Sequence, residues 1–99
     1  MEIRIQSIHF DATEKLQAFI EKKVGKIAKS CDQAATAEVV LKVVKPETAM
    51  NKEVQIRLDV PGGKLHAEKV CDTFEEGIDQ CVEALQRQAE KYKEKQRVK

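Results

Sequence analysis

The sequence predicts an α+β fold, a two-layer sandwich in which two helices cover one face of a four-stranded sheet. In two segments apolar and polar residues alternate with a period of two, as in strands that bury one face, and two further segments are strand-like from their β-branched residues or from a preceding turn. Two other segments carry an apolar stripe at helical spacing. The segments follow the order β-α-β-β-β-α, and a one-sided sheet and one-sided helices bury their apolar surfaces best against each other.

The four strands are predicted from alternation and from β-branched residues. The first is expected at residues 2–8, where the polarity alternates throughout. Segments 35–45 and 52–60 are rich in β-branched residues and predict the second and third strands. The sequence PGG at 61–63 predicts a tight reversal into a fourth strand at 64–69, because proline presets φ and glycine accepts a positive φ. Short connections between the last three strands predict an antiparallel meander.

The two helices are predicted from apolar stripes and from capping residues. The first is expected from about residue 12 to about residue 30, with Asp11 and Glu14 as a D-x-x-E capping box. The last is expected to begin after Asp72 or Thr73 and to continue to about residue 96, where it frays. The stripes consist of Leu16, Phe19, Ile20, Val24, Ile27 and Cys31 in the first helix, and of Phe74, Ile78, Cys81, Val82, Leu85, Ala89 and Tyr92 in the last.

The length of 99 residues predicts a single domain, 1–99. There are 18 basic and 17 acidic side chains, so the net charge of +1 does not by itself indicate a nucleic-acid partner. No apolar run has the roughly 20 residues that cross a bilayer, and the N-terminal segment lacks the apolar stretch of a signal peptide. We therefore expect a cytoplasmic protein without a membrane partner.

The cysteines and histidines do not indicate a reactive site. Cys31, Cys71 and Cys81 are odd in number and lack disulfide-framework or zinc spacings, so we interpret them as buried small hydrophobic residues. His9 and His66 stand at no known catalytic spacing from Ser or Cys. The PGG turn lacks the helix and lysine of a phosphate-binding loop. We expect neither an enzyme nor a cofactor, metal or small-molecule substrate.

The charge of the first helix favours phosphate binding. Between residues 15 and 29 there are five lysines and one acid, Glu21. A solvated helix face without a partner usually mixes the signs more evenly. Four of the lysines share one side of the helix, well away from the apolar stripe. These four are Lys15, Lys22, Lys26 and Lys29.

The charge of the last helix is divided along its length. Residues 72–83 hold five acids and no base, and residues 84–99 hold six bases and two acids. Interaction with the helix dipole alone explains such a division. The bases nevertheless include a row at four-residue spacing, Arg87, Lys91 and Lys95. If the helices are neighbours, we expect the two rows to form one continuous basic surface that contacts phosphates. Because aromatic residues are scarce, structured RNA fits this surface better than stacked single strands.

The chain resembles the ribosome hibernation promoting factor family, with its relatives ribosome-associated inhibitor A and the sigma-54 modulation proteins. Segments 37–45, 54–69 and, above all, 73–95 carry the resemblance, which covers nearly the whole chain in the same element order. The most specific positions are Ile78, Asp79, Leu85, Arg87, Gln88, Lys91, Tyr92, Lys93 and Lys95.

The resemblance implies a fold related to the double-stranded RNA-binding domain and a ribosomal partner. Proteins of the family sit on the small ribosomal subunit, in the channel for messenger and transfer RNA, and block translation when growth slows. Basic residues of both helices are then expected to meet the ribosomal RNA backbone, without catalysis. These residues are Lys22, Lys26, Lys29, Arg87, Lys91 and Lys95, with Lys42 and Lys45 as weaker candidates.

Two departures from the family pattern affect the expected RNA contacts. Relatives often carry a lysine where this chain has Ala84, and a base where it has Glu90. Each lost phosphate contact weakens binding and flattens its salt dependence. With 99 residues the chain resembles the short type of the family, without a domain that dimerises ribosomes or the tail of ribosome-associated inhibitor A.

Two other functions remain open from the sequence. One is a protein-interaction module whose acidic residues dock a basic partner, and the other is a general binder of double-stranded RNA. Phosphate binding should weaken steeply as salt rises, whereas a mainly apolar protein interface responds less. The acidic residues are Glu75, Glu76, Asp79 and Glu83.

Overall fold

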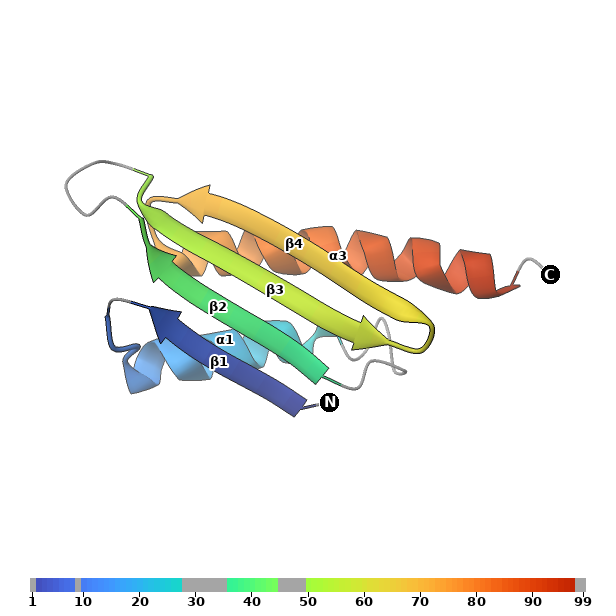
Figure 1. Ribbon diagram of the computed structural model, residues 1–99, viewed down its shortest axis with the longest axis horizontal. Coiled ribbons are helices and arrows are strands. Elements are labelled where there is room, and N and C mark those ends of the chain that lie inside the picture. Colours follow the sequence, from blue (N-terminus) through green and yellow to red (C-terminus); the bar gives the residue numbers. More distant parts are fainter. Residues whose placement is uncertain (1, 9, 28–35, 45–49, 98–99) are drawn as a thin grey trace.

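The computed structural model describes residues 2–8, 10–27, 36–44 and 50–97, with the surroundings of side chains described as far as Tyr92. In Figure 1 four strands form one sheet and both helices lie behind it, so the expected α+β sandwich is confirmed. The elements in chain order are β1 (Glu2–Ile8), α1 (Glu14–Gly25), β2 (Thr36–Val43), β3 (Lys52–Val60), β4 (Gly63–Cys71) and α3 (Phe74–Arg97).

The sheet is mixed, with the strand order β1-β2-β3-β4. Strands β2, β3 and β4 form the expected antiparallel meander, and the turn between β3 and β4 places Gly62 at a φ of 85°. The sequence did not predict that β1 pairs with β2 in parallel, with Ile5 beside Val39. The chain returns through α1 to the end of the sheet where β1 began, and a strand that starts there runs parallel to β1.

One face of the sheet is buried and the other is wet. Val39 lies beside Ile56, which lies beside Ala67, and all three are buried on the face that the helices cover. On the opposite face the guanidinium of Arg57 lies 3.8 Å from the carboxylate of Glu38. The period-two alternation of the sequence therefore separates core from solvent as predicted.

The apolar stripes of both helices complete the core. Ile20 and Val24 of α1 and Ile78 and Leu85 of α3 are fully buried. Phe74, at the start of α3, stacks on Phe10 with 4.7 Å between the ring centroids and closes one end of the core. The helices pack against each other as well as against the sheet (Figure 1).

The N-terminus of α1 differs from the expected capping box. Thr13, rather than Asp11, is the N-cap, and its hydroxyl accepts a hydrogen bond of 3.1 Å from the backbone N–H of Leu16. Thr13 directly precedes the first helical residue, so its short side chain reaches the third amide of the helix, which Asp11 does not. The helix ends at Gly25, before the expected end near residue 30; residues 28–30 lie outside the described part of the chain.

The sequence offers two N-cap residues for α3, Asp72 and Thr73, and the structure shows which of them caps the helix. The hydroxyl of Thr73 accepts a hydrogen bond of 3.1 Å from the N–H of Glu76, so Thr73 caps the helix. The carboxylate of Asp72 instead accepts a 2.7 Å hydrogen bond from the N–H of Met50, ahead of β3. Asp72 thus joins the end of β4 to the start of β3.

Two cysteines are buried in this core, as the sequence interpretation expects. Cys71 and Cys81 are almost fully inaccessible, and the thiol of Cys81 lies 3.6 Å from the carbonyl oxygen of Val54. Burial raises the pKa of Cys81 from its ordinary value of 9.0 to about 12. Burial also raises the pKa of Cys71, and Glu76 and Asp72 add to the rise. Thiols held neutral in this way are poor nucleophiles. Cys31 lies outside the described residues.

A glycine in the first turn of α3 allows the helix to approach β3 closely. A Cβ atom built on Gly77 would lie 2.7 Å from Cγ2 and 3.3 Å from Cβ of Val54. Val54 is fully buried and β-branched, so its side chain has little room to move away.

We expect Gly77→Ala to lower the free energy of unfolding by about 1–2 kcal/mol, because overpacking costs roughly 1–3 kcal/mol and the better helix propensity of alanine returns only about 0.5–1 kcal/mol. Urea denaturation measures the change. In a Val54→Ala background the same substitution should cost less, since the clashing methyl groups are gone. An equal cost in both backgrounds would contradict the steric explanation.

We expect the free energy of unfolding to fall more steeply with rising pH above pH 9 in the wild-type protein than in Cys81→Ala. The unfolded chain releases the Cys81 proton from about pH 9 upward, while the native state keeps it to about pH 12, so in that window the unfolded state binds fewer protons. The difference in slope approaches about 1.4 kcal/mol per pH unit. Denaturation curves at several pH values measure it, and equal slopes would contradict the prediction.

Candidate nucleic-acid interface

The outward side of α3 carries two of the predicted basic residues. Ile78, Leu85 and Ala89 are fully buried, and at about 100° per residue Arg87 falls on the side directly opposite them. Arg87 and Lys91 are both exposed. Lys95 belongs to α3, but its side chain lies beyond the described surroundings.

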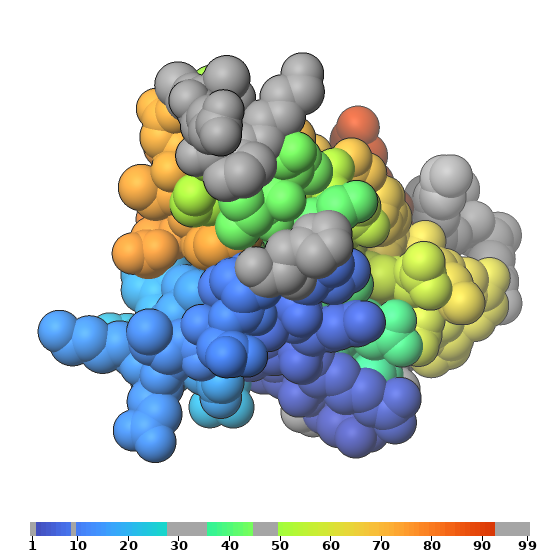
Figure 2. Space-filling model, turned by 60° about the vertical axis from the view of Figure 1, so that its left-hand side comes forward, coloured from blue at the N-terminus to red at the C-terminus, as the bar shows by residue number. Residues whose placement is uncertain are grey.

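The lysines of α1 divide into two groups. Lys22 and Lys26 are exposed, as expected for residues that contact a partner. Lys23 instead has its ammonium nitrogen 3.3 Å from a carboxylate oxygen of Asp79 in α3 and 5.5 Å from the centroid of the Phe19 ring. Lys23 therefore joins the two helices. Figure 2 shows α1, in light blue, in contact with the orange residues near the start of α3, while other side chains of α1 stand out into solvent.

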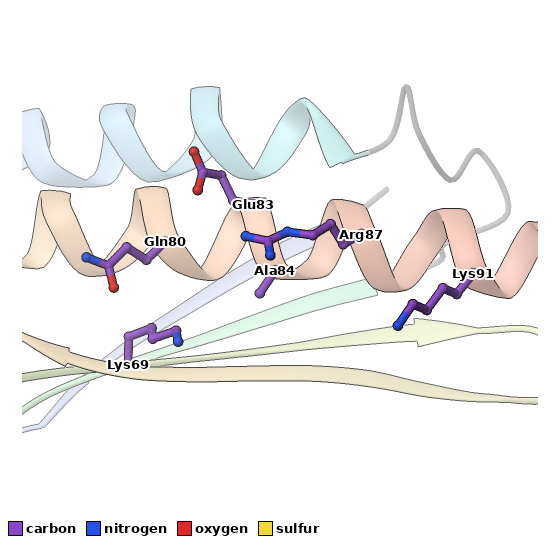
Figure 3. Close-up of a pocket in the computed structure, with 6 residues that line it drawn as sticks. All are labelled: Lys69, Gln80, Glu83, Ala84, Arg87 and Lys91. Carbon is purple, nitrogen blue, oxygen red and sulfur yellow. The ribbon is translucent and has the colours of Figure 1, made fainter.

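The continuity of the two basic rows stays a prediction, since Lys29 and the side chain of Lys95 lie outside the described part of the chain. Acidic side chains lie on the side of α3 that meets α1. Asp79 contacts α1, and helical spacing places Glu83 and Glu90 on the same side of α3. In Figure 3 the carboxylate of Glu83 points toward α1. We call Asp79, Glu83 and Glu90 the acidic seam. Its members Asp79 and Glu83 lie beside α1, because packing turned the acidic side of α3 toward α1.

A groove lies on the other side of α3, next to β4. Its volume is about 340 Å³. Figure 3 shows Lys69 reaching from β4 toward the helix, Lys91 extending toward the strands and Arg87 running along α3 toward Ala84. The lining residues are Lys69, Gln80, Glu83, Ala84, Arg87 and Lys91.

Sequence reasoning missed Lys69, because position 69 belongs to a strand whose register with β3 was unknown. In the structure Lys69 pairs with Val54 and therefore lies on the helix-covered side of β4. Lys42 follows the buried Leu41 and pairs with Glu53, so it lies on the opposite face of the sheet, apart from the cations of the helices. Lys29 and Lys45 lie outside the described residues.

One side chain of α3 is hydrogen-bonded to the edge strand of the sheet. The Gln88 side-chain amide donates a 2.8 Å hydrogen bond to the carbonyl oxygen of His66 and accepts one of 3.3 Å from its N–H. The same glutamine thereby fixes the position of Arg87 and Lys91 relative to β4. In the described part of the chain, no three His, Cys, Asp or Glu residues are grouped to hold a metal ion, and no helix is long and apolar enough to span a membrane.

The sequence matches a family and several of its members. Residues 3–97 match the family model described as sigma 54 modulation protein / S30EA ribosomal protein. A ribosome hibernation promoting factor of Pseudomonas putida is 28% identical over 96 residues, covering 97% of this chain and 90% of the relative. A protein of the same name from Acidithiobacillus ferridurans is 32% identical over 79 residues, covering 80% of this chain and 100% of the relative.

Solved structures share the fold. The N-terminal domain of Thermus thermophilus Protein Y superposes with a TM-score of 0.80 at 23% identity, covering 93% of this chain and 99% of that domain. A ribosomal subunit interface protein from Coxiella burnetii gives a TM-score of 0.83 at 22% identity, covering 94% and 98%. Since the family model spans all but the first two and last two residues, this chain belongs to the sigma 54 modulation protein / S30EA ribosomal protein family, and the resemblance seen in the sequence is confirmed.

Proposed function

We propose that this protein binds the small ribosomal subunit through its ribosomal RNA and blocks translation by occupying the channel for messenger and transfer RNA. The observation that carries the proposal is the set of exposed cations on the outer side of the helical layer. Within the described residues, no acid lies at ion-pair distance from any of these cations. The names of the relatives, which are ribosome hibernation promoting factors, support the same partner. The cations are Lys22, Lys26, Arg87 and Lys91.

The chemistry of these side chains suits the backbone of folded RNA. A lysine or arginine that neutralises a phosphate releases a condensed counterion, which drives association at low salt. Arginine also presents a planar fork that binds phosphate oxygens in pairs. Such contacts recognise the shape of an RNA surface rather than its sequence.

Tyr92 supports recognition by shape, because it is engaged within the protein. Tyr92 is the only tyrosine in the sequence and belongs to the same helix as Arg87 and Lys91. Its hydroxyl donates a hydrogen bond to the carbonyl oxygen of Pro61, and its ring packs against the core. A half-buried ring held in this way offers a base only part of its face, so backbone contacts fit the surface better.

The proposed inhibition requires occupancy alone. A domain bound by phosphate contacts fills the space that messenger and transfer RNA need, and its removal restores the channel. Under this proposal the protein acts in the cytoplasm with the intact ribosome or its small subunit as partner. No reaction step and no cofactor is needed.

A protein-interaction module remains the second candidate, supported by exposed acids at the start of α3. Glu75, Glu76 and Glu83 are exposed, but Asp79 is bonded to Lys23, which reduces the acidic patch available to a basic partner. General binding of double-stranded RNA is the third candidate. It predicts equal affinity for short RNA duplexes and for small subunits, whereas the proposed function predicts a preference for small subunits.

We expect the double variant Lys22→Glu, Lys26→Glu to bind small subunits roughly 50- to 100-fold more weakly at about 0.1 M salt, because two phosphate contacts each contribute close to tenfold there. Co-sedimentation with small subunits through a sucrose cushion at low and moderate salt measures this. Both side chains are exposed, so the domain should stay folded. Because they lie in the last turn and at the C-cap of α1, where acids oppose the helix dipole, the thermal unfolding midpoint should fall by a few degrees.

The matched control is Arg4→Glu with Lys64→Glu, which makes the same change of net charge. Both residues are exposed and lie on the face of the sheet opposite the helices. The control should sediment as the wild type does. Unchanged sedimentation of the α1 variant would contradict the proposed surface, and binding that is insensitive to salt would favour a protein interface at the acidic residues.

A further inference from the structure

The groove between α3 and β4 brings together three cations from two elements. Lys69 comes from the edge strand β4, and Arg87 and Lys91 come from α3 (Figure 3). All three are exposed, and none lies at ion-pair distance from an acid of the described residues. Like charges that share a groove repel one another, and an anion bound between them removes that repulsion.

The position of Lys69 follows from the register of the sheet. Its partner Val54 and its neighbour in alternation, Ala67, are buried under α3. Lys69 points to the same side but remains exposed, since β4 is the edge strand. In Figure 3 the side chain of α3 drawn above Lys69 is that of Gln80, and Ala84 follows farther along the helix toward Arg87.

The groove has a net positive charge despite one acid in its lining. Glu83 is the only carboxylate among its lining residues, and in Figure 3 it points toward α1, away from Lys69 and Lys91. Gln80 is neutral and can donate a hydrogen bond. The volume of about 340 Å³ is ample for a tetrahedral phosphate with some of its water.

We propose that this groove binds one backbone phosphate of RNA, and that Lys69 of β4 supplies one of its cations beside those of α3. The identity of the ligand rests on the proposed RNA-binding function. Arg87 donates its planar N–H groups to two phosphate oxygens, while Lys69 and Lys91 contribute point charges from the two walls of the groove. The RNA contacts of this chain therefore extend from the helices to the edge of the sheet.

The test compares Lys69→Met with Lys64→Met. Methionine keeps most of the aliphatic stem of lysine and removes its charge. Lys64 serves as the control because it is an exposed lysine of the same strand on the opposite face of the sheet. We would measure the affinity for small subunits and, separately, the affinity for a short mixed-sequence RNA duplex. The salt concentration would run from roughly 0.05 to 0.3 M, the range in which phosphate contacts dominate the affinity. Lys69→Met should flatten the slope of log K against log salt by about 0.7–0.9 and weaken binding roughly five- to tenfold near 0.1 M salt. Lys64→Met should match the wild type.

Two further variants test the groove by adding or restoring charge. Lys69→Met with Ala84→Lys moves the cation from β4 to α3 and should recover the wild-type slope. Glu83→Gln removes the one carboxylate of the lining and should strengthen binding. A recovered slope would show that charge in the groove, rather than the integrity of β4, determines the affinity. Thermal unfolding of each variant controls for folding.

The outcomes separate this inference from the proposed function. Suppose that Lys69→Met binds small subunits and the RNA duplex with the affinity and salt slope of the wild type, while the double variant Lys22→Glu, Lys26→Glu loses binding. The proposed phosphate site in the groove is then overturned, and the proposed function stands. If the wild type binds no small subunits at any salt, the proposed function is overturned. Binding of the RNA duplex then tests the phosphate site. A flatter slope of log K against log salt for Lys69→Met than for the wild type supports the site, and equal slopes overturn it.

Discussion

Burial of the α3 stripe against β3 and β4 fixes the direction of every charged side chain on that helix. Ile78, Leu85 and Ala89 are fully buried, and one step of about 100° around the axis would bring charged residues into the core. Burying an unpaired charge costs far more than any surface contact returns. The rotation of α3 is therefore set by its apolar residues. The acidic seam beside α1 and the basic groove beside β4 both follow from that rotation.

Most of the fold could be predicted because its signals are local. The alternation of β1 and β3 gave their bounds, and the PGG turn gave the reversal before β4. The parallel pairing of β1 with β2 could not be read in this way, since it depends on where the chain re-enters the sheet after α1. The start of α1 was misplaced because Asp11 and Thr13 both have capping side chains, and the sequence does not show which of them adopts the extended backbone conformation that precedes the helix.

Within the candidate interface, the exposure of a cation could be predicted from the sequence only where its position on a single helix determines it. The exposure of Lys22 and Arg87 follows from helical spacing alone. The roles of Lys23 and Lys69 depend on neighbouring elements: Lys23 is held by Asp79 across the helix pair, and Lys69 reaches the groove through its register with Val54. The place of Asp79 and Glu83 beside α1 has the same origin, since the side of α3 that meets α1 is a property of tertiary packing.

The two hydrogen bonds between Gln88 and His66 also limit how other chains can associate with this protein. β4 is an edge strand, and unpaired N–H and C=O groups along such an edge are a template for strand addition. At His66, near the middle of β4, the glutamine amide already occupies both groups, as a neighbouring strand would. An incoming strand would have to displace that amide before it could pair there. The middle of the β4 edge is thereby less open to strand addition than a bare edge would be.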